Sequence, residues 1–245
     1  TTLLAQVDSS VGGKTGINVA QGKNLVGAFH QPRRVIVDLA TIATLPERQR
    51  RAGYAEIVKY GLIDRADFFT WLETHGAEML AGAPDALATA IAESCRAKAT
   101  VVAADEREAG QRALLNLGHS FGHALEAALG YDGRLLHGEA VAIGMVLAAD
   151  LSVALGHTDA AERERIAAHL RSVGLATSVA ELDAALAPER LMTLMAQDKK
   201  VRDGRLHFVL LRGIGRAFLS DDVPRDLVQG VLAHSCAGTG TIAGD

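Results

Sequence analysis

The sequence is poor in cysteine and aromatic residues and has no excess of positive charge. The two cysteines, Cys95 and Cys236, lie far apart and match no zinc-binding spacing, so we expect them to act as small hydrophobic residues in a reducing cytosol. Aromatic residues make up only 4% of the chain, and alanine is abundant, which favours helices over a β-sandwich. The net charge of −4 gives no indication of binding to nucleic acid or to an anionic membrane.

Long hydrophobic runs are missing as well. The longest uninterrupted apolar run, residues 140–149, is too short to cross a bilayer, and no signal peptide is visible, so we expect a cytoplasmic protein without membrane contact. The 245 residues suffice for one large or two ordinary domains. The chain begins without an initiator methionine, inside a segment (1–7) that reads as a buried strand, and we expect it to be part of a longer protein.

Strand and turn patterns are confined to the two ends of the chain. Besides the strand at 1–7, the sequence predicts a hairpin around Gln21-Gly22 and a strand at 33–38. Near the other end, residues 201–205 carry a hairpin signal that precedes a strand at 206–211.

Between these ends the pattern is helical. Helices are predicted near residues 47–64, 66–81, 84–108, 112–129, 137–155, 159–173 and 188–198. A last helix begins near Pro224. The prediction is therefore an α+β fold that is mainly α, with a short β-containing segment at residues 1–46 and a helical domain at residues 47–245.

The most informative stretch is residues 112–126. Read as one helix, it carries five polar residues along one narrow stripe: Arg112, Asn116, His119, His123 and Glu126. Unpaired buried polar groups lose about 1–3 kcal/mol each, so the stripe is expected to face a polar pocket or a metal. Gly118 and Gly122 would let another backbone approach closely. Two histidines four residues apart are, taken alone, more often ordinary surface or core residues.

Two further stretches supply candidate partners for these histidines. Glu56 and Lys59 lie three apart on a predicted helix, where a solvated ion pair is the ordinary explanation; if buried, Glu56 would need a cation, either Lys59 or a metal. His137 begins the most apolar helix, where a capping or surface histidine is the alternative. On three separate helices, Glu56, His119 and His137 would make a His₂Glu set with one open position, typical of catalytic zinc.

The glycine-rich turn at residues 8–16 indicates an anion site. Gly13-Lys14-Thr15 does not complete a P-loop, because Asp8 stands where that motif needs a glycine. What remains is a cluster of backbone amides beside a lysine, suited to phosphate, with an ordinary tight turn as the alternative. Lys98 and the pair Lys199-Lys200 look like surface charges when taken alone.

Six segments together resemble the 3-dehydroquinate synthase family. They are residues 3–16, 22–29, 55–61, 115–124, 137–141 and 198–200, and the resemblance runs from residue 1 to about residue 230. It implies a Rossmann-like NAD-binding α/β domain, of which residues 1–46 would be the C-terminal remnant, followed by a helical metal-binding domain at 47–245. It also implies conversion of 3-deoxy-D-arabino-heptulosonate 7-phosphate to 3-dehydroquinate and phosphate, through transient oxidation, phosphate elimination, reduction and an intramolecular aldol step.

The resemblance implies roles for individual residues by motif position. The ligands of one divalent metal, Zn²⁺ or Co²⁺, would be Glu56, His119 and His137. The phosphate would be surrounded by Lys14, Asn24, Asn116, His123 and one of Lys199 and Lys200. The substrate carboxylate would be held by Lys98 and Arg112, and the ring hydroxyls contacted by Asp8 and Lys59. NAD would touch Thr1, Thr2, Lys14, Lys23, Thr41, Ile42, Ala43 and Thr44. The expected catalytic residues are Lys14, Lys59, Asn116 and His123.

The resemblance also implies a homodimer, in which the family borrows an arginine from the partner's N-terminal domain. Most of the nucleotide-binding domain would lie upstream, so we expect the chain alone not to turn over substrate. Three alternatives stay open: another sugar phosphate cyclase, a metal-dependent alcohol or glycerol dehydrogenase, and a non-catalytic helical module for metal binding or dimerisation.

Overall fold

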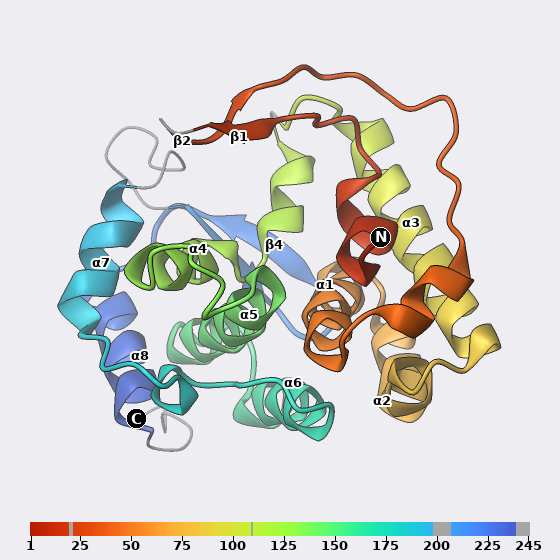
Figure 1. Cartoon of the computed structure of the whole chain (residues 1–245). Helices are drawn as coiled ribbons and strands as arrows, with labels where there is room; N and C mark the ends of the chain where they lie inside the picture. Colours follow the sequence, from red (N-terminus) through yellow and green to blue (C-terminus); the bar gives the residue numbers. More distant parts are fainter. Residues whose placement is uncertain (20–21, 109, 198–206, 239–245) are drawn as a thin grey trace.

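The computed structural model describes residues 1–19, 22–108, 110–197 and 207–238 (Figure 1). The described chain is mainly helical, as predicted from the sequence. Its α-helices are α1 (Glu47–Asp64), α2 (Ala66–Leu80), α3 (Pro84–Ala104), α4 (His119–Ala128), α5 (His137–Ala154), α6 (Ala160–Ser172), α7 (Pro188–Gln197) and α8 (Arg225–Ala237). Short helical turns of other types are η1 (Ala5–Ser9), η2 (Leu39–Thr44), η3 (Gln111–Asn116) and η4 (Val179–Glu181).

Two small antiparallel hairpins accompany the helices. One pairs β1 (Ile17–Val19) with β2 (Gly22–Val26), as the sequence predicted, and the other pairs β3 (Phe208–Leu211) with β4 (Ala217–Ser220). The strand predicted at 206–211 is therefore present, whereas β4 was not predicted. The hairpin signal at 201–205 lies outside the described residues.

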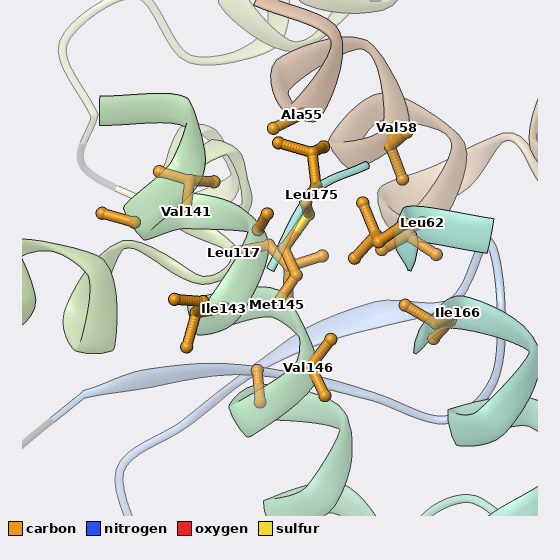
Figure 2. Close-up of a cluster of buried hydrophobic side chains, with 14 of the residues drawn as sticks. Ala55, Val58, Leu62, Leu117, Val141, Ile143, Met145, Val146, Ile166 and Leu175 are labelled. Atoms are coloured by element: carbon orange, nitrogen blue, oxygen red, sulfur yellow. The ribbon is translucent and has the colours of Figure 1, made fainter. Parts of the chain in front are cut away.

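Helix α5 is the centre of the core. It packs against α1, α4, α6, α8 and β3, because residues 140–149 are apolar on every face of the helix. Figure 2 shows Val141, Met145 and Val146 of α5 among side chains from the surrounding elements. Among the described residues, α5 is the one helix long and apolar enough to span a membrane by length and composition, and 78% of it is buried inside the protein.

Glycines set how closely the neighbouring helices approach α5. A Cβ atom added to Gly144 would lie 2.0 Å from the carbonyl oxygen of Gly118, and one added to Gly138 would lie 1.7 Å from that of Ala52 in α1. The sequence expectation for Gly118 and Gly122 is confirmed, since added Cβ atoms would lie 2.8 Å and 3.2 Å from backbone atoms of α5. Close backbone contact thus fixes α1 and α4 against the start of α5.

The prediction of one continuous helix over 112–129 is wrong. The segment begins as η3, is extended at Leu117 (ψ 127°), turns at Gly118 in the left-handed region (φ +78°) and only then enters α4. Glycine adopts that conformation without the Cβ penalty of other residues, so Gly118 breaks the helix where the sequence suggested only close packing. Arg112 and Asn116 consequently do not share a helical stripe with His119.

Two strands predicted within residues 1–46 are wrong as well. Residues 1–7 lead into the π-helical turn η1, although the apolar side chains of Leu3 and Val7 are buried as expected. Residues 33–38 form no regular element, and Ile36 is 89% exposed. A strand requires a hydrogen-bonded neighbour, and no strand pairs with 33–38 within the described ranges. The predicted helix starting at residue 84 also ends earlier, at Ala104.

The glycine contact between α5 and the start of α4 gives a stability prediction. Gly144→Ala is expected to destabilise the fold by about 2 kcal/mol or more, because the gain in helix propensity is outweighed by overpacking against backbone that cannot move aside. Gly230→Ala in α8 is the matched control, since its Cβ would meet nothing within 4 Å; it should stabilise by about 0.5–1 kcal/mol. Denaturant unfolding measures both, and equal effects of the two substitutions would contradict the packing argument.

A buried histidine gives a second prediction. His169 of α6 lies 3.0 Å from the hydroxyl of Tyr54, and burial lowers its pKa; Glu73 opposes this shift and Arg165 adds to it. The unfolded chain therefore takes up a proton at the ordinary value of about 6.5, before the folded chain does. Stability should decrease as the pH falls from about 6.5 towards the lowered pKa.

The matched variant His169→Gln removes this titration while retaining an acceptor for the Tyr54 hydroxyl. Unfolding free energies measured at about pH 7.5 and about pH 5.5, on either side of the ordinary pKa, should show the advantage of the wild type shrinking at the lower pH. A difference that stays constant between the two pH values would contradict the assignment.

Candidate metal and anion site

Three candidate metal ligands from different helices converge in the structure. Oε1 of Glu56, on α1, lies 3.6 Å from Nε2 of His119 and 3.3 Å from Nε2 of His137, and one donor atom from each residue lies within 4.8 Å of the others. Two ligands bound to a tetrahedral zinc at about 2.0–2.2 Å are about 3.4 Å apart, which matches these separations. The structure thus brings together the carboxylate and the two imidazoles that the sequence singled out.

Backbone geometry positions both imidazoles. His119 is the first residue of α4, directly after the left-handed turn at Gly118, and its Nδ1 lies 3.1 Å from the carbonyl oxygen of Leu117. His137 is the first residue of α5, whose start is fixed by a 2.8 Å hydrogen bond from the backbone N–H of Leu136 to Glu139. Each ring therefore projects from a helix start and directs Nε2 toward Glu56.

The carboxylate of Glu56 is fully buried and remains ionised. Burial alone would raise the pKa of Glu56, but the ammonium of Lys59 and the two imidazoles hold it well below its ordinary value. Burial opposes the charge of Lys59 as well, yet its ion pair with Glu56 and the charge of Asp8 raise the pKa of Lys59. The alternative of a solvated pair is therefore wrong, since both side chains are buried.

Glu56 also retains unused acceptor capacity. Apart from the Lys59 ion pair and the two imidazoles, no hydrogen-bond donor among the residues that the structure describes reaches either carboxylate oxygen. A buried carboxylate in this state is costly unless a cation completes its environment. One carboxylate oxygen and two imidazole nitrogens form a donor set that suits a divalent ion of the zinc type and leaves a position open. The residues present therefore fit such an ion.

His137 interacts with carboxylates on both of its nitrogens. Its Nδ1 lies 3.3 Å from Oε2 of Glu126, a buried residue of α4. Burial alone would lower the pKa of His137, but hydrogen bonds to Glu126 and Glu56 outweigh burial and raise it to about 9. His123, Glu126 and His137 form a second group whose donor atoms lie within 4.8 Å of one another.

A line of buried charges continues from Lys59 through Asp8. The carboxylate of Asp8 lies 3.9 Å from Nζ of Lys59 and 3.0 Å from Nζ of Lys98, and it accepts a 2.8 Å hydrogen bond from the hydroxyl of Tyr60. Lys98 is only 7% exposed, so the surface-charge interpretation is wrong for this residue. Burial lowers the pKa of Lys98, with Asp8 opposing the shift. Tyr60 is a contact that sequence reasoning missed, because it looked like an ordinary core aromatic.

Arg112 joins this line at the glycine-rich turn. Its guanidinium is buried and donates to the carbonyl oxygen of Gly12 at 2.6 Å and to that of Glu106. A Cβ atom on Gly12 would lie 2.9 Å from Nη2 of Arg112 and 3.3 Å from Cε of Lys98, and Gly12 has φ +103°. The turn can lie against the two cations only because glycine stands there.

Two of the candidate phosphate residues meet at a side chain that sequence reasoning missed. Glu108 forms an ion pair with Lys14 and accepts a 2.6 Å hydrogen bond from Asn116. It lies in the acidic run 105–108, which gives no signal in the sequence beyond that of a solvated charge run, and it has φ +60°. The ring of His123 lies near the metal candidates, with its centroid 5.5 Å from that of His119 and 6.2 Å from that of His137.

The other candidate residues lie apart from this cluster or outside the description. Thr2 accepts a hydrogen bond from the backbone of Ala5, and Thr1 is exposed. In the turn η2, Thr41 accepts a 3.3 Å hydrogen bond from Gln6, and Ile42 is buried. The side chains of Lys23 and Asn24 lie outside what the structure describes, as do the residues Lys199 and Lys200.

Family models and curated relatives match the chain along most of its length. A model described as 3-dehydroquinate synthase C-terminal matches residues 53–201, and one described as 3-dehydroquinate synthase N-terminal matches residues 1–52. The 3-dehydroquinate synthase of Nitrobacter winogradskyi is 59% identical over 97% of this chain and 63% of its own length. That of Rhodospirillum rubrum is 62% identical over 89% and 57%, respectively. The chain thus spans less than two thirds of these relatives.

Two solved enzyme structures are similar in fold to this chain. One is the 2-epi-5-epi-valiolone synthase ValA from Streptomyces hygroscopicus, with NAD⁺ and Zn²⁺ bound (TM-score 0.85, 33% identity, 97% of this chain and 64% of that chain). The other is a 2-deoxy-scyllo-inosose synthase complexed with carbaglucose-6-phosphate, NAD⁺ and Co²⁺ (TM-score 0.84, 28% identity, 96% and 65%).

Removing the buried carboxylate should abolish tight metal binding. Glu56→Gln is expected to weaken zinc binding by more than about 100-fold, because it removes a charged metal ligand and not merely a group that contacts a ligand. The measurement is competition with a chromogenic chelator, starting from metal-free protein. Glu47→Gln, at the exposed start of the same helix, is the matched control and should bind zinc like the wild type.

Glu56→Gln also leaves Lys59 buried without its closest counter-charge, at a cost of about 3–5 kcal/mol. The double variant Glu56→Gln/Lys59→Met removes both charges and should recover much of that stability without recovering zinc affinity. Unchanged zinc affinity in either variant would contradict the assignment of Glu56.

Proposed function

This chain belongs to the 3-dehydroquinate synthase family, and on that premise we propose that it is part of an enzyme converting 3-deoxy-D-arabino-heptulosonate 7-phosphate to 3-dehydroquinate and phosphate. The observation that carries the proposal is the ionised, buried carboxylate of Glu56, which faces two imidazoles beside a line of buried cations. Packing alone does not explain this arrangement, because replacing a buried ion pair by apolar residues is often neutral or stabilising.

The metal site would be held by Glu56, His119 and His137. The ion, Zn²⁺ or Co²⁺, supplies Lewis-acid polarisation of substrate oxygen atoms when bound. The chain's own contribution is to direct three donor atoms at one point from three helices. Lys59 compensates the charge of Glu56 locally, so that the site holds one buried carboxylate without a large net charge.

The buried cations suit the carboxylate and hydroxyl groups of the substrate. Lys98 and Arg112 lie on either side of Gly12, and the planar guanidinium of arginine matches a carboxylate in two parallel hydrogen bonds. Asp8 and Lys59 would contact ring hydroxyls, where the carboxylate of Asp8 accepts hydrogen bonds and the ammonium of Lys59 donates them. The position of Asp8 between Lys59 and Lys98 supports this division of roles.

The phosphate would be bound at the opposite end of the site. Lys14 and Asn116 both direct their donors at one carboxylate, that of Glu108, which supports their assignment to an anion. His123 lies one helical turn after His119, and we assign it to proton transfer beside the departing phosphate. Asn24 and one of Lys199 and Lys200 complete this part of the proposal.

NAD is proposed as the second cofactor, with contacts at Thr1, Thr2, Lys14, Lys23 and residues 41–44. Support comes from the similar solved structures, whose titles name NAD⁺, and from the match of residues 1–52 to the N-terminal family model. The proposal includes residues 1–46 as part of the NAD-binding domain, residues 47–245 as the metal- and substrate-binding domain, a homodimer and a cytoplasmic location.

The activity of another sugar phosphate cyclase is the nearest alternative, because the similar solved structures are those of a valiolone synthase and an inosose synthase. The buried pair Lys98 and Arg112 favours a substrate with a carboxylate, which glucose 6-phosphate and sedoheptulose 7-phosphate lack. A non-catalytic metal-binding or dimerisation module would bind metal without turning over any of these sugars.

Turnover assays of the whole protein test the proposal. With NAD⁺ and zinc or cobalt, heptulosonate phosphate should yield 3-dehydroquinate and phosphate in equal amounts, without net accumulation of NADH. The 245-residue chain alone is expected to give no product, because the curated relatives are longer by more than a third. Turnover of glucose 6-phosphate or sedoheptulose 7-phosphate instead, net NADH formation, or no turnover of any sugar would each overturn the assignment.

A further inference from the structure

Both ring nitrogens of His137 have defined contacts, one toward the candidate metal site and one away from it. The imidazole of His137 directs Nε2 toward Glu56 of α1 and Nδ1 toward Glu126 of α4, with 3.3 Å separating each nitrogen from its carboxylate oxygen. Glu126 is buried and lies seven residues after His119, two turns further along α4. The ring of His137 is therefore held between carboxylates carried on two different helices.

His119 has an equivalent arrangement. Its Nδ1 lies 3.1 Å from the carbonyl oxygen of Leu117 and its Nε2 lies 3.6 Å from Glu56. The carbonyl of Leu117 can only accept, and a carboxylate accepts when ionised, so Nδ1 carries a hydrogen in both rings. Nε2, which faces Glu56, is then the nitrogen that a metal would take in place of a proton. In the metal-bound protein the two rings would share one tautomer, fixed by the backbone for His119 and by a side chain for His137.

We propose that Glu126 is a positioning residue that fixes the orientation and tautomer of His137 for binding a divalent metal. This inference rests on the metal site of the proposed function. The negative charge of Glu126 increases the basicity of the imidazole as a ligand, which an uncharged acceptor such as the Leu117 carbonyl does less strongly. Glycine contacts hold α4 against α5, and so keep Glu126 within reach of the ring.

The competing role for Glu126 is direct coordination. Together with His123 and the same imidazole of His137, it could hold a second ion. That role requires Nδ1 of His137 as a ligand atom, whereas the first site requires Nε2 of the same ring. Both nitrogens can bind metal only if the imidazole loses both hydrogens, so the number of ions bound per chain separates the two roles.

The test compares zinc affinity in Glu126→Gln and in Glu73→Gln. Glu126→Gln keeps the size of the side chain and removes its charge, and we expect zinc to bind about 10–100-fold more weakly, with a changed absorption spectrum of the cobalt-loaded protein. Glu73→Gln is the matched control: Glu73 of α2 pairs with Arg165 of α6, and its substitution should leave the zinc affinity within about twofold.

Several outcomes would overturn the proposal. They are an unchanged dissociation constant in Glu126→Gln, two tightly bound zinc ions per chain in the wild type, or no zinc binding by the wild type. A measurement on the wild type avoids any dependence on the folding of the variant: NMR of the histidine ring nitrogens in zinc-loaded protein should show Nδ1 of His137 protonated, and metal on that nitrogen would contradict the role.

The test also separates this inference from the proposed function. Loss of zinc affinity in Glu126→Gln, in a protein that turns over no heptulosonate phosphate, would leave the role of Glu126 intact and remove the proposed activity. Normal turnover together with unchanged zinc affinity in Glu126→Gln would remove the role of Glu126 and leave the proposed activity intact.

Discussion

The carboxylate of Glu56 has no exposure to solvent, and its charge has to be balanced by groups from several elements. Transfer of an ion into a protein interior costs several kcal/mol even after relaxation. Lys59 provides the nearest counter-charge from the same helix, and the imidazoles of α4 and α5 face the remaining acceptor positions. The arrangement of α1, α4 and α5 is therefore tied to one charge at their meeting point.

Close backbone packing converts this electrostatic requirement into a defined geometry. Gly118 and Gly144 bring α4 against α5, and Gly138 brings α5 against α1. Both histidines stand at the first position of their helices, so their ring positions follow from where the backbone turns rather than from a flexible connection. Interiors packed at this density resist adjustment, which keeps the donor atoms together when no ligand is bound.

The helical part of the fold could be predicted from the sequence because its signals are local. Pro46 and Pro224 mark helix starts, and the apolar run of α5 predicts a buried helix. The break at Gly118 could not be predicted this way, because glycine in a helical pattern is equally compatible with close packing and with a left-handed turn. The strand predicted at 33–38 is not formed for a different reason: a strand depends on a hydrogen-bonded neighbouring strand, which the local sequence does not reveal.

The same distinction, between local sequence signals and contacts with distant residues, applies to the candidate site. Glu56, His119 and His137 could be selected by residue type and by their places on predicted helices, and the structure brings them together. Lys98 could not be distinguished from a surface lysine, because its burial depends on Asp8, ninety positions away in the chain. Glu108 gave no signal at all, since its partners Lys14 and Asn116 come from separate segments.

The bridge that Glu108 makes between Lys14 and Asn116 has a consequence for any anion that enters there. In the proposed function, an incoming phosphate would exchange with this carboxylate, so its observed affinity would be the difference between the affinities of the two anions for the same donors. Lys14 and Asn116 keep their orientation without a bound phosphate, because Glu108 already accepts from them. A phosphate ion released from the substrate would compete less well against the tethered carboxylate than one still attached, and this would favour its departure.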